Sequence, residues 1–253
     1  MYLSAIRLAI LGCGLLTAAP AAAQLRLPGK APAEKSEAAE TDTTTDSSDV
    51  LVGQVVGGFD GIARTFELAA GVSMRSNQQL FGALGLKDQA NAIKQTIQNL
   101  KAIEDPQERQ AKMTETLSDP QIAADLASAI KDAVELTDAQ RKSVSEAHLL
   151  NLRAALTFTD LAMDTVQLAS AVTQLGLGLT NPATIAAMER NGKTPEWFKQ
   201  TLKPALKGID SGAKAFDKSA KKNAKMMSDL FKRFDIEPAD PAKVTALDES
   251  SGW

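Results

Sequence analysis

Six lysines near the C-terminal end of the chain are spaced so that one helix would present them together. They recur every three, four or seven positions, and at about 100° per residue they form one narrow stripe. The six are Lys207, Lys214, Lys218, Lys221, Lys225 and Lys232. Ammonium groups on an exposed helix bind anions without a cofactor. We therefore predict a surface here for an anionic lipid or polysaccharide, or for an envelope protein.

The segment that carries this stripe is basic within an acidic chain. Residues 193–233 hold 11 Lys and Arg against 4 Asp and Glu, whereas the whole chain has a formal net charge of −3. The alternative interpretation is a solvated helix face, supported by the i,i+4 pairs Asp210–Lys214, Asp217–Lys221 and Asp229–Arg233. We expect no nucleic-acid partner, because the stripe lacks interleaved stacking aromatic residues. Association with a second copy of the chain is a further expected mode of binding.

Catalytic chemistry has few candidate residues. The chain has one histidine, His148, and the nearest acid along the same predicted helix, Glu146, lies on another face. A general base needs an acid or nucleophile within hydrogen-bond reach. Glycine-flanked serine motifs and phosphate-binding loops are also missing from the sequence. We expect a non-enzymatic protein without catalytic residues, metal or cofactor, in which His148 is half-buried or at the surface.

The first residues of the chain predict export. Residues 8–24 read LAILGCGLLTAAPAAAQ, with an apolar run after Arg7, then a proline and three alanines before Gln24. This order matches a secretory signal peptide with a small-residue cleavage site. We predict a signal peptide over residues 1–23 and a periplasmic or secreted product that contains no cysteine. The alternative is a lipoprotein anchored through Cys13.

The rest of the chain divides into three parts. Residues 24–49 are acidic and contain almost no large apolar side chain, so we predict a disordered linker. Residues 50–235 contain the capping residues, prolines and glycines that begin and end helices, and no strand pattern, so we predict one all-helical domain. Residues 236–253 are expected to form a flexible tail. The predicted fold class is all-α, a multi-helix bundle of about seven helices with one long central helix.

Helix boundaries are marked by capping residues followed by proline or glycine. An Asx or Thr side chain can cap a helix whose first residue is proline. The predicted starts are Asp105–Pro106, Asp119–Pro120, Asn181–Pro182 and Thr194–Pro195, together with a Thr137–Gln140 capping box, and the predicted stop is Asn191–Gly192.

The longest predicted helix runs from Asp138 to Leu179 and has a regular apolar seam. The seam comprises Ala154, Phe158, Leu161, Thr165, Leu168, Val172, Leu175 and Leu179. Spacings of three and four are typical of coiled-coil-like packing. We expect its partners to be amphipathic helices at Val50–Leu84 and Lys207–Phe234. The opposite side should carry Arg153, Asp160, Asp164, Gln167 and Gln174.

Two segments raise the question of membrane contact. Gly53, Gly57 and Gly61 lie four residues apart, and residues 165–188 contain no charge. We interpret the glycines as a close-packing face or a frayed start of a helix in water, and the uncharged segment as a buried bundle helix. The alternative is a membrane-active protein that inserts residues 53–84 and 165–188 after a conformational change. Our leading expectation is an exported bacterial binding or assembly module of the cell envelope.

Overall fold

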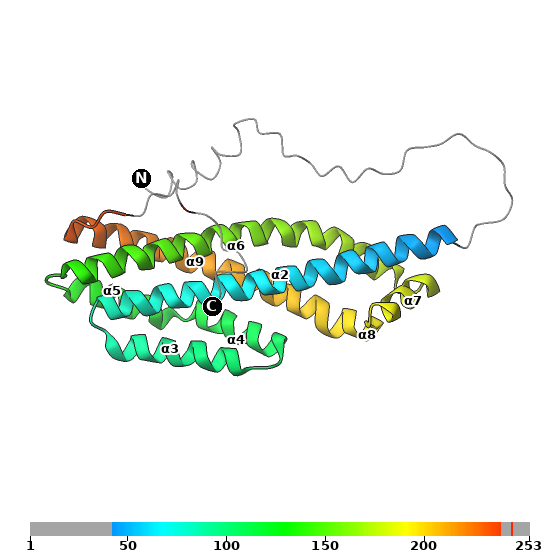
Figure 1. Cartoon of the computed structure of the whole chain (residues 1–253), viewed down its shortest axis with the longest axis horizontal. Helices are drawn as coiled ribbons and strands as arrows, with labels where there is room; N and C mark the ends of the chain where they lie inside the picture. The colour runs from blue at the N-terminus through cyan, green and yellow to red at the C-terminus, as the bar shows by residue number, and fades with distance from the viewer. Residues whose placement is uncertain (1–41, 239–243, 245–253) are drawn as a thin grey trace, which may run out of the picture.

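The computed structural model describes residues 42–238 and residue 244, and every regular element in this part of the chain is a helix (Figure 1). The predicted all-α fold is therefore confirmed. Three long helices run along the molecule: α2 (Asp42–Ala83), α6 (Asp138–Gly178) and α9 (Lys203–Phe234). The predicted long helix matches α6 to within one residue at its C-terminal end.

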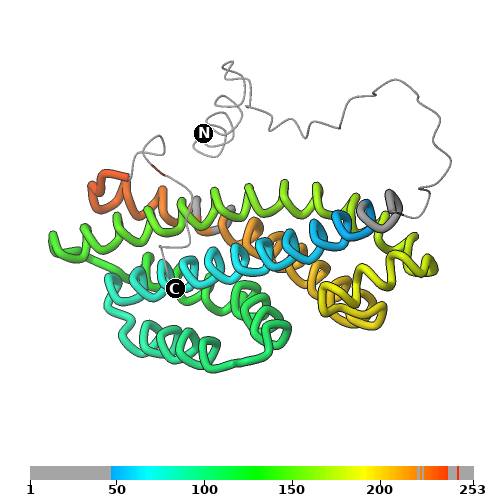
Figure 2. The backbone as a smooth tube through the Cα atoms, turned by 45° about the vertical axis from the view of Figure 1, so that its right-hand side comes forward, coloured from blue at the N-terminus to red at the C-terminus, as the bar shows by residue number. Residues whose placement is uncertain are grey.

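Shorter helices cover the two ends of this frame. They are α3 (Lys87–Ala102), α4 (Pro106–Ser118), α5 (Pro120–Asp132), α7 (Pro182–Arg190), α8 (Pro195–Trp197) and the π-helical turn η1 (Phe198–Leu202). The helices α3, α4 and α5 lie together at one end, and α7 and α8 lie at the other (Figure 1). Figure 2 shows α2 and α6 running side by side along the length of the molecule.

The predicted helix boundaries are confirmed by their hydrogen bonds. The Asp105 carboxylate accepts backbone N–H bonds at 2.7 and 3.0 Å at the start of α4, and Asp119, Asn181 and Thr194 cap the other three proline boundaries. Thr137 and Gln140 form the reciprocal capping box of α6. The stop after α7 uses Gly192, whose φ of +65° is a left-handed conformation that glycine adopts without strain.

The core lies where α2, α6 and α9 meet. α2 and α6 are antiparallel, because Gln140 donates to the Ala83 carbonyl at 2.8 Å and Ser76 donates to the Ala147 carbonyl at 2.6 Å. Phe158 of α6 contacts Phe66 of α2 edge-on at 5.9 Å and stacks on Phe216 of α9 at 4.1 Å. The two expected partner helices are thus confirmed. The buried seam residues of α6 are Ala154, Phe158, Leu161, Leu168, Val172 and Leu175.

The close-packing interpretation of the α2 glycines is wrong. Gly53, Gly57 and Gly61 are exposed, and a Cβ added at any of them would have no neighbour within 4 Å. They share the solvent side of α2 with charged residues, because its apolar residues occupy the opposite side. The close approach occurs instead at Gly212 of α9, where a Cβ would lie 2.6 Å from the ring of Phe66.

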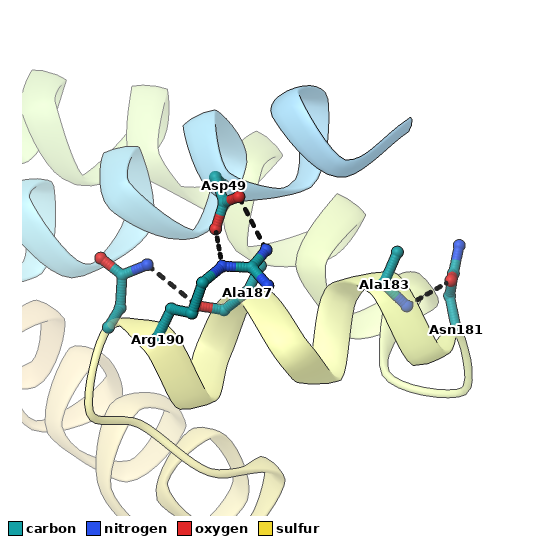
Figure 3. A network of polar contacts seen from close by, with 6 residues as sticks. Asp49, Asn181, Ala183, Ala187 and Arg190 are labelled. Atoms are coloured by element: carbon teal, nitrogen blue, oxygen red, sulfur yellow. Dashed lines mark hydrogen bonds and ion pairs between the residues drawn. The ribbon is translucent and has the colours of Figure 1, made fainter. Parts of the chain in front are cut away.

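The predicted boundary between linker and domain at residue 50 is also wrong, since α2 begins at Asp42. Asp49 makes a two-point ion pair with Arg190 of α7, with N–O distances of 3.0 and 2.7 Å (Figure 3). The predicted boundary rests on the composition of residues 24–49, which cannot reveal a contact with a residue 141 positions away. The predicted signal peptide, the remaining linker over residues 24–41, and most of the tail lie outside the described residues.

The start of the predicted tail is packed against the bundle. Ile236 is buried, and its N–H donates to the Phe231 carbonyl at 3.0 Å. Within the described part of the chain, no helix is both long enough and apolar enough to cross a membrane.

Candidate anion-binding surface

The helix α9 separates apolar and basic side chains onto opposite sides. Ala205, Ile209, Phe216, Met227, Leu230 and Phe234 are buried on its inner side. On the outer side, Lys207, Lys214, Lys218, Lys225 and Lys232 are exposed. The backbone of Lys221 lies in α9 between them, and its side chain lies outside the described part. We call these six residues the basic face of α9.

Contacts at the start of α9 hold this face outward. Phe198 and Leu202 of η1 are buried, and the Trp197 ring meets Phe59 of α2 edge-on at 6.2 Å. The ammonium group of Lys203 lies 5.1 Å from the centre of the Phe198 ring. Because these aromatic rings fix where the helix begins, they set the direction in which the following lysines point.

Contacts near the end of α9 complete its placement. Arg233 donates to the carbonyls of Ile130 and Lys131 at 2.7 and 3.1 Å, which ties α9 to the end of α5. Phe231 is buried against the His148 ring of α6, with 4.9 Å between the ring centres. A helix held at both ends against other helices cannot turn its basic face inward.

Of the three i,i+4 pairs predicted along α9, one is formed and one is not, and the third involves Lys221, whose side chain is outside the described part. Lys214 pairs with Asp210 at 2.6 Å. No ion pair joins Asp229 to Arg233 among the described side chains, since Arg233 is bonded to carbonyl groups. Among those same side chains, no carboxylate lies within ion-pair distance of Lys207, Lys218, Lys225 or Lys232. These four side chains are exposed and therefore accessible to an anion.

His148 lies at the contact between α6 and α9. Its side chain is half-buried, as predicted. Burial lowers its pKa to about 4, so the ring is neutral at pH 7. Its Nδ1 is buried without a hydrogen-bond partner among the described residues. The ring of this histidine packs between α6 and α9.

An open groove between α3, α4 and α5 was not anticipated from the sequence. It has a volume of about 730 Å³, and its lining includes Glu115, Asp119 and Asp125. Asp119 is engaged as the cap of α5, accepting from the Gln121 N–H at 2.8 Å. The described residues contain no group of three side chains placed to hold a metal ion. The Asp–Pro boundaries predict the short helices, but the width of the groove depends on their packing.

Comparisons with known proteins leave the function to be argued from this geometry. No protein-family model matches the chain, and neither a curated protein nor a solved structure matches it. The basic face of α9 is the strongest candidate for a functional surface in the described structure.

Proposed function

We propose that the protein is an exported, non-enzymatic binding module that docks onto anionic phospholipid at the cell envelope through the basic face of α9. The observation that carries this proposal is a row of exposed lysines, four of them without a carboxylate partner among the described side chains, on a helix that the fold holds in place. From Lys207 to Lys232 the row spans about 38 Å at 1.5 Å per residue. This length lets several lysines approach a flat surface at once.

The energetics favour reversible attachment. A lysine near an anionic membrane surface contributes about 1 kcal/mol, so three lysines together account for about 3 kcal/mol. That free energy corresponds to roughly a 100-fold change in the dissociation constant. Attachment of this kind weakens with salt, because the screening length falls from about 10 Å at 0.1 M to about 3 Å at 1 M.

The test is co-sedimentation with vesicles of anionic or neutral phospholipid. The variant K218Q/K225Q/K232Q removes three basic-face lysines at intervals of seven. The matched control K87Q/K94Q/K101Q removes three exposed lysines of α3 at the same intervals and changes the net charge equally. We expect the first variant to bind anionic vesicles about 100-fold more weakly, and the control to change binding by less than about 3-fold. Equal losses in both variants would show that net charge, not the face, drives binding.

Two further outcomes separate this proposal from its alternatives. Circular dichroism should show both variants fully helical, because all six lysines are exposed. Binding that resists 1 M salt and is released only by detergent would indicate insertion of helices into the membrane. Binding to neither vesicle would contradict the proposal.

Export is tested independently of the surface. We expect the exported protein to begin at Gln24, because three alanines precede that residue after an apolar stretch. Mass spectrometry of the intact exported protein measures this terminus. A lipid-modified chain beginning at Cys13 would instead establish an anchored lipoprotein.

A further inference from the structure

The outward face of α6 carries a second apolar seam, opposite the one buried in the core. Its positions alternate spacings of three and four over about 42 Å of helix. They are Leu149, Leu152, Leu156, Thr159, Met163, Val166, Ser170, Thr173 and Leu177. The first three are half-buried, whereas Met163, Val166 and Leu177 are 55%, 74% and 80% exposed. We call these nine residues the outer seam of α6.

The polar residues of the outer seam do not make it hydrophilic. The hydroxyls of Thr159 and Thr173 donate to the carbonyls four residues earlier, at 2.9 and 2.8 Å. A hydroxyl bonded to its own helix leaves the methyl group as the outward part of the side chain. No charged residue occurs from Thr165 to Gly178. A surface of this kind, repeated every seven residues, matches the side that one helix of a coiled coil presents to another.

Two charged residues on one flank of the outer seam have no opposite charge within ion-pair distance among the described side chains. Arg153 has a buried Nε without a hydrogen-bond partner among the described residues. Asp160 lies seven residues later, and burial together with the nearby charge of Asp164 raises its pKa. One flank therefore holds Arg153, whose Nε could donate to an acceptor, and one heptad later Asp160, whose carboxylate could pair with a cation.

We infer that the outer seam of α6 binds a second copy of this chain in antiparallel orientation, with Arg153 of each copy facing Asp160 of the other. In an antiparallel pair, residues on the same flank of the two seams meet across the interface. The register that joins Arg153 to Asp160 also sets Leu156 beside Thr159 and Leu149 beside Val166. A parallel pair would place Arg153 near His148 instead and leave both charges unpaired.

The opposite flank suits the same arrangement. It carries Ala155, Ala162 and Ala169, whose small side chains let two helices approach closely. In the register above, Ala155 of one copy lies beside Ala162 of the other. A two-fold axis forms each of these contacts twice, so the face is complementary to itself. This self-complementarity is the reason for naming a second copy rather than an unrelated protein.

The first test exchanges the charges and measures the mass of the purified full-length chain by light scattering. We expect the parent to have twice the monomer mass of 26.8 kDa at micromolar concentration, and R153D and D160R each to have the monomer mass. Each variant places like charges at both Arg153–Asp160 contacts. The double variant R153D/D160R restores opposite charges and should be dimeric again. An equimolar mixture of the two single variants should form a mixed dimer.

The second test addresses the apolar contact and the folding of the variants. V166E introduces a charge at a position that is exposed in the single chain, so it should dissociate the dimer without changing the helical content. The controls K94D and D88R reverse charges on the exposed side of α3 and should remain dimeric. A monomeric parent would overturn the inference, and so would single charge variants that stay dimeric or fail to assemble when mixed. If the parent is monomeric and binds neutral vesicles, and V166E does not bind them, the outer seam of α6 contacts lipid instead.

Discussion

The helices α6 and α9 both pack an apolar side into the same core, but their outward sides differ. The outer side of α9 carries five exposed lysines, whereas the outer side of α6 has exposed Met163, Val166 and Leu177 and no charge from Thr165 to Gly178. Hydrated ammonium groups are stable in water and attract anions. Exposed apolar side chains are stabilised when another apolar surface covers them.

This difference shows that an amphipathic pattern identifies the side of a helix that faces the core. It does not determine the outward side, which is basic in α9 and apolar in α6. Lysines mark the outer side of α9 as a surface for water or anions. α6 has apolar residues on both sides, so its sequence predicts the inner seam but does not indicate whether the outer one is also covered. The seam through Phe158, Leu161 and Leu168 is the one that meets α2 and α9.

The largest expected effect tests which side of α6 is the inner one. Leu168 is 6% exposed, and its Cδ1 lies 2.9 Å from the position of a Cβ at Gly58. L168D places an unpaired carboxylate in the core and should lower the free energy of unfolding by about 4 kcal/mol. Q167A changes an exposed neighbour and should alter it by about 0.5 kcal/mol or less. Urea denaturation followed by circular dichroism measures both, and equal small effects would mean that the seam is misassigned.

A second expected effect tests the contact between α6 and α9 through His148. Its pKa is about 4 in the folded chain and 6.5 in the unfolded chain, so the unfolded chain binds the proton more readily. The contribution of this group to stability is present above pH 6.5 and is lost as the pH falls toward 4. The loss amounts to about 3 kcal/mol.

The measurement compares the parent with H148F. Phenylalanine keeps an aromatic ring beside Phe231 and has no titrating group. Denaturation at pH 7 and pH 4 should show that the parent loses about 3 kcal/mol more than the variant. Identical pH dependence in the two proteins would place His148 in solvent.

The smallest expected effects compare an inward and an outward glycine. G212A puts a methyl group 2.6 Å from the fully buried Phe66 ring, and should lower the free energy of unfolding by about 1–3 kcal/mol. G61A adds a methyl group in open space on an exposed helix, and should raise it by about 0.5–1 kcal/mol. Thermal unfolding resolves the two signs. Destabilisation by G61A would mean that the glycine side of α2 is covered.

Much of the candidate surface could be predicted because it depends on one helix. The lysine spacing alone indicates that Lys207, Lys218 and Lys225 share a face, and the structure places them together and exposed. The sequence could not predict that no carboxylate among the described side chains pairs with these lysines. Asp229 and Arg233 have the spacing of an ion pair, but Arg233 binds carbonyls of α5 that lie about a hundred residues away in the sequence.

The sequence by itself determined the helical class, the capped boundaries and the inner seam of α6, because these follow from interactions within a few residues along the chain. Capping joins residues two or three positions apart, and an apolar seam follows from the helical repeat. Only the tertiary structure decided that α2 extends back to Asp42, that Gly212 rather than Gly61 makes the close approach, and that the outer seam of α6 is left uncovered by the described part of the chain. Each of these depends on which distant helix lies alongside, and the free energy of that packing is a sum over contacts between residues far apart in sequence.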